Sequence, residues 1–336
     1  MNNAGVSKKL ALVALVVVAS ATLPWLVSPF YVRVLLLFYM SAVLAVAWNI
    51  LGGFAGYWSF GHAAFFGMGA FGAAHLGTAM AAYGSNPVTM VVVIAGATPI
   101  CAIFAAVIAY PLLRLRGIYF AIATLSFTEV LRAVVHQLPS RIAGGAPGLN
   151  VPALFRPTFV AGEMERWEVA FIRNEGYFLI YAAVLVFTLL LSIIIQRTRL
   201  RYAFTAVRTN QEVAAVMGVN PARTKLLAFV LSSVPVGLLG AVAAHRFGSV
   251  NPFETFSIHT TVLALVTPIF GGLYTTVGPL LGATVLAGIE ETLRRSLDSG
   301  YMIAYGVVLV FAVLFMPRGL VGLLGKLFRR RREAAK

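Results

Sequence analysis

The sequence predicts an all-α, polytopic integral membrane protein with about ten membrane segments, some of them broken by glycine. Two observations lead to this prediction. The 336-residue chain is 60% hydrophobic and only 11% charged, whereas a soluble domain carries about 25% charged residues. Many of its apolar runs are also long enough to cross a bilayer. We therefore expect one transmembrane domain, residues 1–336, within the lipid bilayer.

The distribution of charge indicates a membrane topology and not a nucleic-acid partner. The net charge is +15, but the basic residues lie in short segments between apolar runs and in the tail, residues 317–336. Cytoplasmic segments of membrane proteins carry such an excess of Lys and Arg. We therefore exclude nucleic acid as a partner, and expect both termini in the cytoplasm of a bacterial cell and the spans in its inner membrane.

Composition also limits the chemistry of the chain. Cys101 is the only cysteine, so neither an intrachain disulfide nor a cysteine metal cluster can form. The sequence contains no G-x-x-x-x-G-K-[ST] phosphate-binding loop. If ATP powers the protein, another chain binds it, and we expect no metal and no cofactor in this one.

Apolar runs place the membrane segments in order along the chain. The first, residues 10–27, contains Ala19-Ser20-Ala21, so both an uncleaved span and a signal peptide cleaved after Ala21 stay open. Residues 138–176 carry four Arg and four Glu, and this neutral balance suits a periplasmic loop. The other unbroken spans are expected at residues 32–51, 62–82, 88–113, 116–135, 177–195, 226–247 and 301–315.

Two glycine-rich stretches interrupt this pattern. We interpret residues 52–61 as a tight break before the span at 62–82, and residues 260–289 as too long and glycine-rich for one helix. A break at Gly271-Gly272 returns the basic tail to the cytoplasm, either as two spans or as a re-entrant pair of half-helices. Such breaks line a cavity or are buried in protein, and close helix packing explains glycines as well. The predicted helix-break residues are Gly52, Gly53, Gly61, Gly271, Gly272 and Gly278.

A basic segment, residues 196–225, lies between two apolar runs and has one acid, Glu212. Within its helix-compatible core, residues 208–218, the pattern E-x-A-x-x-x-G runs from Glu212 to Gly218. It resembles the EAA loop of ABC importer permeases, a short helix that docks on the cytoplasmic ATPase, although Val213 replaces the first Ala. A basic loop that only sets topology is the alternative. The resemblance implies that the ATPase-coupling residues are Arg208, Glu212, Ala214, Ala215 and Gly218.

A second resemblance is more specific. Residues 56–70 read G-x-x-S-x-G-H-A-A-F-F-G-x-G-A, which is similar to a signature of the LivH/LivM family of branched-chain amino acid permeases. The segments R-G-I-Y-F-A-I-A-T-L from Arg116, G-G-A-P-G-L-N-V-P from Gly144 and M-P-R-G-L-V-G from Met316 resemble the LivM branch. These blocks extend the resemblance over residues 49–322.

The resemblance implies a permease subunit of a binding-protein-dependent ABC importer that works by alternating access. Its partners would be a LivH-like permease subunit, two cytoplasmic ATPase subunits and a periplasmic amino-acid-binding protein. The solutes would be leucine, isoleucine and valine, with other amino acids, amides or urea as alternatives within the family. ATP would be hydrolysed on the partner subunits, so we expect no enzyme activity in this chain.

Polar residues within apolar spans are candidates for the translocation path, although interhelical hydrogen bonds are the alternative for each. Glu129 and Arg132 lie three residues apart on one helical face, which permits either structural pairing or a place on the path. Glu129 is also the one fair candidate for an ion-coupled secondary transporter, the rival class. The candidates are Asn49, Ser59, His62, Thr124, Ser126, Thr128 and Glu129.

The broken segment yields a topological prediction. A reporter fused after Lys336 is expected to read as cytoplasmic, and one fused at Leu297 as periplasmic, because the break adds one crossing of the membrane. Compartment-specific reporter activity measures both positions. A cytoplasmic signal at Leu297 would exclude the broken-segment topology.

Overall fold

The computed structural model describes residues 11, 13–19, 22–23, 26, 29–81, 87–145, 148–151, 175–297, 300–315 and 319–322. Helices dominate the described residues, as predicted. In chain order the elements are α2 (Pro29–Asn49), η1 (Ile50–Phe54), α3 (His62–Met80), α4 (Pro87–Leu112), α5 (Ile118–Gln137), α6 (Ser140–Ala143), β1 (Leu149–Asn150), α8 (Glu175–Arg197), α9 (Leu200–Thr209), α10 (Gln211–Val216), α11 (Pro221–Phe247), β2 (Ser249–Val250), α12 (Pro252–Thr255), α13 (Ile258–Gly271), α14 (Val277–Ser296) and α15 (Tyr301–Phe315).

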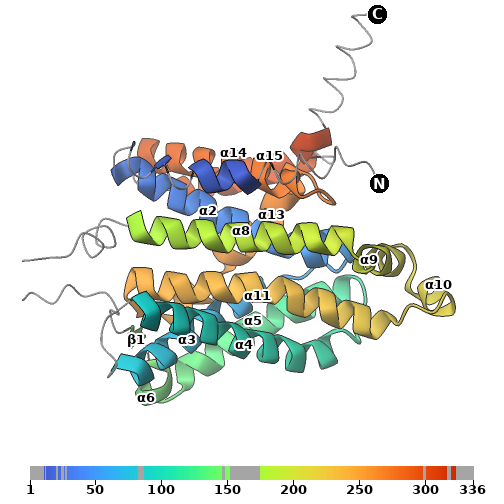
Figure 1. Ribbon diagram of the computed structural model, residues 1–336, viewed down its shortest axis with the longest axis horizontal. Coiled ribbons are helices and arrows are strands. Elements are labelled where there is room, and N and C mark those ends of the chain that lie inside the picture. Colours follow the sequence, from blue (N-terminus) through green and yellow to red (C-terminus); the bar gives the residue numbers. More distant parts are fainter. Residues whose placement is uncertain are drawn as a thin grey trace, which may run out of the picture.

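The long helices form a bundle with two distinct ends. In Figure 1, α8, α11, α4 and α14 run along the long axis of the molecule. Helices α9 and α10 lie at one end, here named the α10 end, whereas β1 and α6 lie at the other, here named the strand end. At the strand end β1 pairs antiparallel with β2, Leu149 opposite Val250.

Close glycine contacts join α11 to α3 in the middle of the bundle. A Cβ on Gly69 would lie 2.0 Å from the carbonyl oxygen of Gly237, and one on Gly240 would lie 2.0 Å from that of Phe66. The two backbones therefore touch directly, as small residues permit in membrane helices. This confirms close packing as a role of the glycines in the span at 62–82.

The first predicted break needs a correction. Gly52 and Gly53 do not leave the helix but belong to the π-helix η1, which continues α2, and the non-helical backbone is confined to residues 55–61. The side chains one turn earlier explain the glycines. A Cβ on Gly52 would lie 2.2 Å from the Trp48 ring, and one on Gly53 would lie 1.9 Å from Asn49 Oδ1.

The second predicted break is confirmed. Helix α13 ends at Gly271, and α14 begins at Val277 after a turn at residues 272–276, in which Gly272 has φ +126°. A Cβ on Gly271 would lie 1.9 Å from the carbonyl oxygen of Gly278, so the two helices meet closely at the turn. The second helix is longer than predicted, because α14 continues past residue 289 to Ser296.

Six helical segments among the described residues are long and apolar enough to cross a membrane. The predicted total of about ten membrane segments therefore stays a prediction. Helix α13, with 14 residues, would be only about 21 Å long, so residues 258–296 remain compatible with two spans or with a re-entrant pair. The six segments are 30–54, 88–112, 118–137, 176–197, 221–247 and 252–271.

Some sequence predictions lie largely outside the described residues. These concern the cleavage position at Ala21, most of the loop at 138–176, and the basic tail at 317–336.

The span predicted at 226–247 begins earlier than expected. Asn220 caps α11 by accepting a hydrogen bond from the Arg223 amide, and Pro221 occupies the first turn of the helix. Proline is favoured at that position, where its missing N–H is no loss.

Packing at Gly69 can be tested with a matched control. Gly69→Ala is expected to destabilise the purified protein by about 1–3 kcal/mol, because the added methyl group overpacks the contact with α11. Gly288→Ala, on α14, has no neighbour within 4 Å of the new Cβ and should leave stability unchanged or raise it. Thermal unfolding in detergent measures both, and equal unfolding temperatures would contradict this packing.

Candidate functional site

The basic segment folds into two helices at the α10 end, not the single core predicted for residues 208–218. Asn210 is extended and separates α9 from α10. Its Oδ1 accepts hydrogen bonds from the amides of Glu212 (2.9 Å) and Val213 (3.2 Å), which is the usual function of an N-cap asparagine. Arg208 thus lies on α9, while Glu212, Ala214 and Ala215 lie on α10.

Gly218 ends α10 as its position in the sequence pattern predicts. Its amide donates to the carbonyl of Ala215, and the Val219 amide donates to that of Ala214. Gly218 has φ +84°, which a glycine adopts without steric cost. No atom lies within 4 Å of where its Cβ would stand, so the turn after α10 faces open space.

Helix α10 lies beyond the end of the bundle (Figure 1), and the helix and its C-cap residue Met217 expose apolar side chains. Val213 is 57% exposed, Val216 88% and Met217 78%. Ala214 is buried and holds the other side of the helix against the protein. A contiguous apolar surface on a projecting element is typical of a protein–protein contact. We name Val213, Val216 and Met217 the α10 surface.

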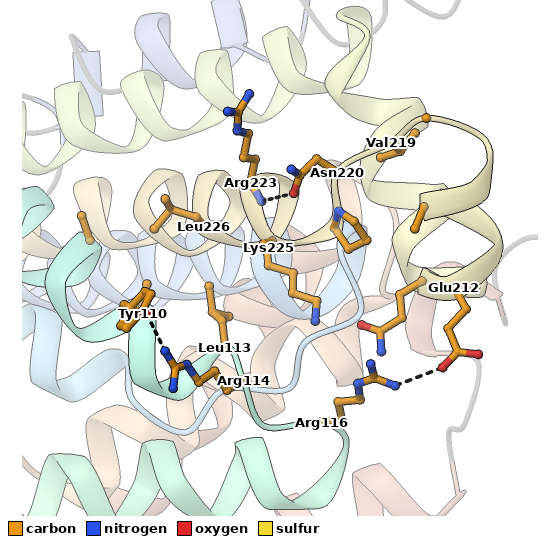
Figure 2. A pocket seen from close by; sticks show the side chains of 17 residues that line it. Tyr110, Leu113, Arg114, Arg116, Glu212, Val219, Asn220, Arg223, Lys225 and Leu226 are labelled. Carbon is orange, nitrogen blue, oxygen red and sulfur yellow. Dashed lines mark hydrogen bonds and ion pairs between the residues drawn. The ribbon is translucent and has the colours of Figure 1, made fainter.

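A groove of about 900 Å³ lies beside α10 (Figure 2). Its walls are the end of α4, the turn before α5, and the start of α11, and Leu113 and Leu226 contribute apolar surface. Arg116 crosses the groove to Glu212, with Nη1 3.2 Å from Oε1. Both side chains are mostly exposed, so this ion pair contributes little stability.

Tyr57, in the first break, makes a second contact with α10. Its hydroxyl donates to Gln211 Oε1 at 3.2 Å. Burial raises the pKa of Tyr57, an effect that Arg116 partly opposes, so the phenol stays protonated as a donor. The Lys225 ammonium lies 4.8 Å from the centre of the same ring, within cation–π range. The first break is thus tied to α10 and to the start of α11.

Four predicted path residues make hydrogen bonds inside the protein. Asn49 bonds the backbone of the second break, and Ser59 Oγ accepts from the Gly61 amide. Thr124 Oγ1 accepts from the Phe60 amide, and the Thr128 hydroxyl donates to the Thr124 carbonyl. These bonds supply the structural alternative for each residue, so contact with a solute stays a prediction.

The remaining path residues divide into three cases. Glu129 forms an ion pair with Arg132, which agrees with the structural alternative, and a place on the path stays a prediction. Ser126 is exposed on α5. His62 is fully buried, and neither ring nitrogen has a hydrogen-bond partner in the described part of the chain. Within that part, no group of three His, Cys, Asp or Glu side chains could hold a metal ion.

Sequence reasoning missed several residues at the α10 end. Tyr274 in the second break has φ +69°, rare for a residue other than glycine, and its ring faces Arg208. Gln196 at the end of α8 donates to Thr276 Oγ1 at 2.8 Å. Asn210 could have been recognised as a cap from the acid two residues later, whereas the contacts of Tyr274 and Gln196 have no local signal.

Known proteins similar to this chain agree on one family. The family described as "Branched-chain amino acid transport system / permease component" matches residues 30–316. The high-affinity branched-chain amino acid transport system permease protein LivM of Escherichia coli K12 is 30% identical over 98% of this chain and 79% of its own length. The LivM protein of Salmonella typhimurium is 29% identical over 94% and 75%, respectively.

More distant relatives match about half of the chain. LivH of Escherichia coli K12 is 25% identical over 53% of this chain and 57% of its own length. BraD of Pseudomonas aeruginosa is 24% identical over 51% and 55%, respectively. No solved structure matches the chain significantly. The helical architecture, the apolar spans and these similarities together show that this chain belongs to the family of branched-chain amino acid transport system permease components.

Proposed function

We propose that this chain is one permease subunit of an ABC importer for leucine, isoleucine and valine, and that α10 is its docking helix for an ATPase subunit. The observation that carries the docking role is the α10 surface, three apolar side chains exposed on a capped helix beyond the bundle. The LivM proteins are named as permease proteins of branched-chain amino acid transport. This supports the solute class.

The assembly follows from the same family. A LivH-like permease completes the translocation path, two ATPase subunits bind at the α10 end, and a periplasmic amino-acid-binding protein delivers the solute at the strand end. In this arrangement both termini and α10 are cytoplasmic. The binding protein selects the solute, so the polar residues of the spans need only let it pass.

Energy coupling depends on the orientation of α10, which is set at its two ends. The cap at Asn210 and the left-handed turn at Gly218 fix the direction in which the α10 surface points. When the ATPase subunits close on ATP, α10 moves with the surface on which it is docked. Helices α9 and α11, joined to its two ends, carry the motion into the bundle.

Uptake by the assembled complex tests the proposed function. Proteoliposomes that contain this chain, its LivH-like partner and the two ATPase subunits are expected to accumulate radiolabelled leucine only with ATP on the ATPase side and binding protein on the other. Omission of each component in turn identifies which partners are required. Accumulation driven by a proton or sodium gradient without ATP would instead identify a secondary transporter.

Charge substitutions in α10 test the docking role. Gly218→Asp places a carboxylate where the C-terminal helix dipole is negative, and Val216→Asp places one within the α10 surface. Desolvating an unpaired charge in an interface is costly, so each should lower uptake and ATPase co-purification on the order of tenfold or more. Glu212→Lys, which places a cation at the start of α10 where the helix dipole is positive, is expected to abolish uptake as well.

Matched variants separate charge from shape. Gly218→Asn has nearly the size of Asp and tolerates a left-handed backbone, and Val216→Ala keeps an apolar surface. Both are expected to retain most ATPase binding, while all variants reach the membrane in normal amounts. Normal ATPase binding and uptake by Gly218→Asp and Val216→Asp together would refute α10 as the docking helix.

A further inference from the structure

The two broken segments meet at the side chain of Asn49. This residue ends α2 and is fully buried. Its Nδ2 donates to the Thr275 carbonyl at 2.9 Å, and its Oδ1 accepts from the Tyr274 amide at 3.4 Å. Gly53 of the π-helix lies directly against the same amide group. One buried side chain therefore holds the turn at 272–276 to the start of the first break.

Arg208 reaches the same junction from α9. Its Nη1 donates to the Gly53 carbonyl at 3.1 Å, a charge-assisted bond to the π-helix. Its guanidinium carbon lies 4.3 Å from the centre of the Tyr274 ring, in the second break. One cation on α9 therefore contacts the π-helix that leads into the first break, through a hydrogen bond, and the turn of the second break, through a cation–π contact.

The backbone at Gly56 leaves room for the Arg208 side chain. A Cβ on Gly56 would lie 2.5 Å from Arg208 Cγ, and Gly56 has φ +79°, so glycine leaves room for the arginine stem. Val207 and Phe204 are buried and fix the rotation of α9 that points Arg208 toward the breaks. The Arg208 side chain thus contacts the membrane segments while it stays partly exposed to solvent, unlike the α10 surface, which faces away from the bundle.

We propose that Arg208 is the positioning residue through which α9 holds both broken segments in register, together with Asn49 and Tyr274; these three residues are named the latch. The proposal rests on the proposed function, because the motion transmitted is that of α10 docked on an ATPase subunit. A displacement of α9 withdraws Arg208 from Gly53 and Tyr274 together. The two breaks then change conformation in one step, and the bundle opens as a unit.

Energy coupling in the assembled complex tests the latch. Arg208→Gln removes the charge and the cation–π contact, and Tyr274→Leu removes the ring. Each is expected to lower the number of leucine molecules imported per ATP hydrolysed by about two- to fivefold, the effect of losing one exposed cation–π contact. Tyr274→Phe keeps the ring and should therefore keep the wild-type number of leucine molecules imported per ATP hydrolysed. Binding-protein-independent ATP hydrolysis and the amount of assembled complex stay normal throughout.

Arg199→Gln is the matched control for charge. Arg199 is an exposed arginine at the N-cap of the same helix, α9, without a side-chain cap hydrogen bond. Its substitution should leave the ratio of leucine to ATP unchanged. An equal loss in Arg199→Gln and Arg208→Gln would show that only the net charge of the segment matters, and an unchanged ratio in Arg208→Gln and Tyr274→Leu would also overturn the latch.

A second measurement keeps the latch separate from the proposed function. In the purified permease alone, Arg208→Gln and Tyr274→Leu should shift the thermal unfolding temperature non-additively, because they remove the same contact. Additive shifts would overturn the latch even if transport is ATP-driven. A wild-type complex that fails to import leucine with ATP would instead refute the proposed function, while the non-additivity still reports on the contact.

Discussion

The amide group of Asn49 is the constraint on which the arrangement of the membrane segments depends. It joins the end of α2 to a turn 226 residues later, and it is fully buried. A buried polar group without its hydrogen bonds costs about 1–3 kcal/mol. The two helices that flank the second break, α13 and α14, therefore take their position from α2 as well as from each other.

Glycine determines how closely the surrounding helices approach. In α3 and α11 the glycines remove side chains from contacts between backbones, whereas in η1 they make room for Trp48 and Asn49 of the same helix. The indole N–H of Trp48 then donates to the Ser59 carbonyl at 2.7 Å, so this carbonyl of the non-helical stretch after η1 has its partner within the protein. Irregular backbone among membrane helices is tolerated on this condition.

Sequence alone predicted the elements better than their contacts. The break at Gly271 was predictable for two reasons. Two glycines are adjacent there, and a single span at this position would leave the basic C-terminal tail outside the cytoplasm. The π-helix was not predictable from the sequence. Gly52 and Gly53 favour a break, and only the structure shows that they make room for the side chains of Trp48 and Asn49. The interruption at Asn210 was missed although an asparagine followed two residues later by an acid is a local signal for a helix start. The contacts of Asn49, Arg208 and Tyr274 join segments more than 60 residues apart and leave no periodic signal.

Helix α10 has only six residues, fewer than two turns, and isolated helices shorter than about 12 residues are marginal in water. The helix is therefore stabilised by the cap at Asn210, the turn at Gly218 and the burial of Ala214. Local unfolding of such an element costs far less free energy than unfolding a long helix of the bundle. Helix α10 can consequently adjust its conformation to an approaching subunit while the membrane helices keep their packing.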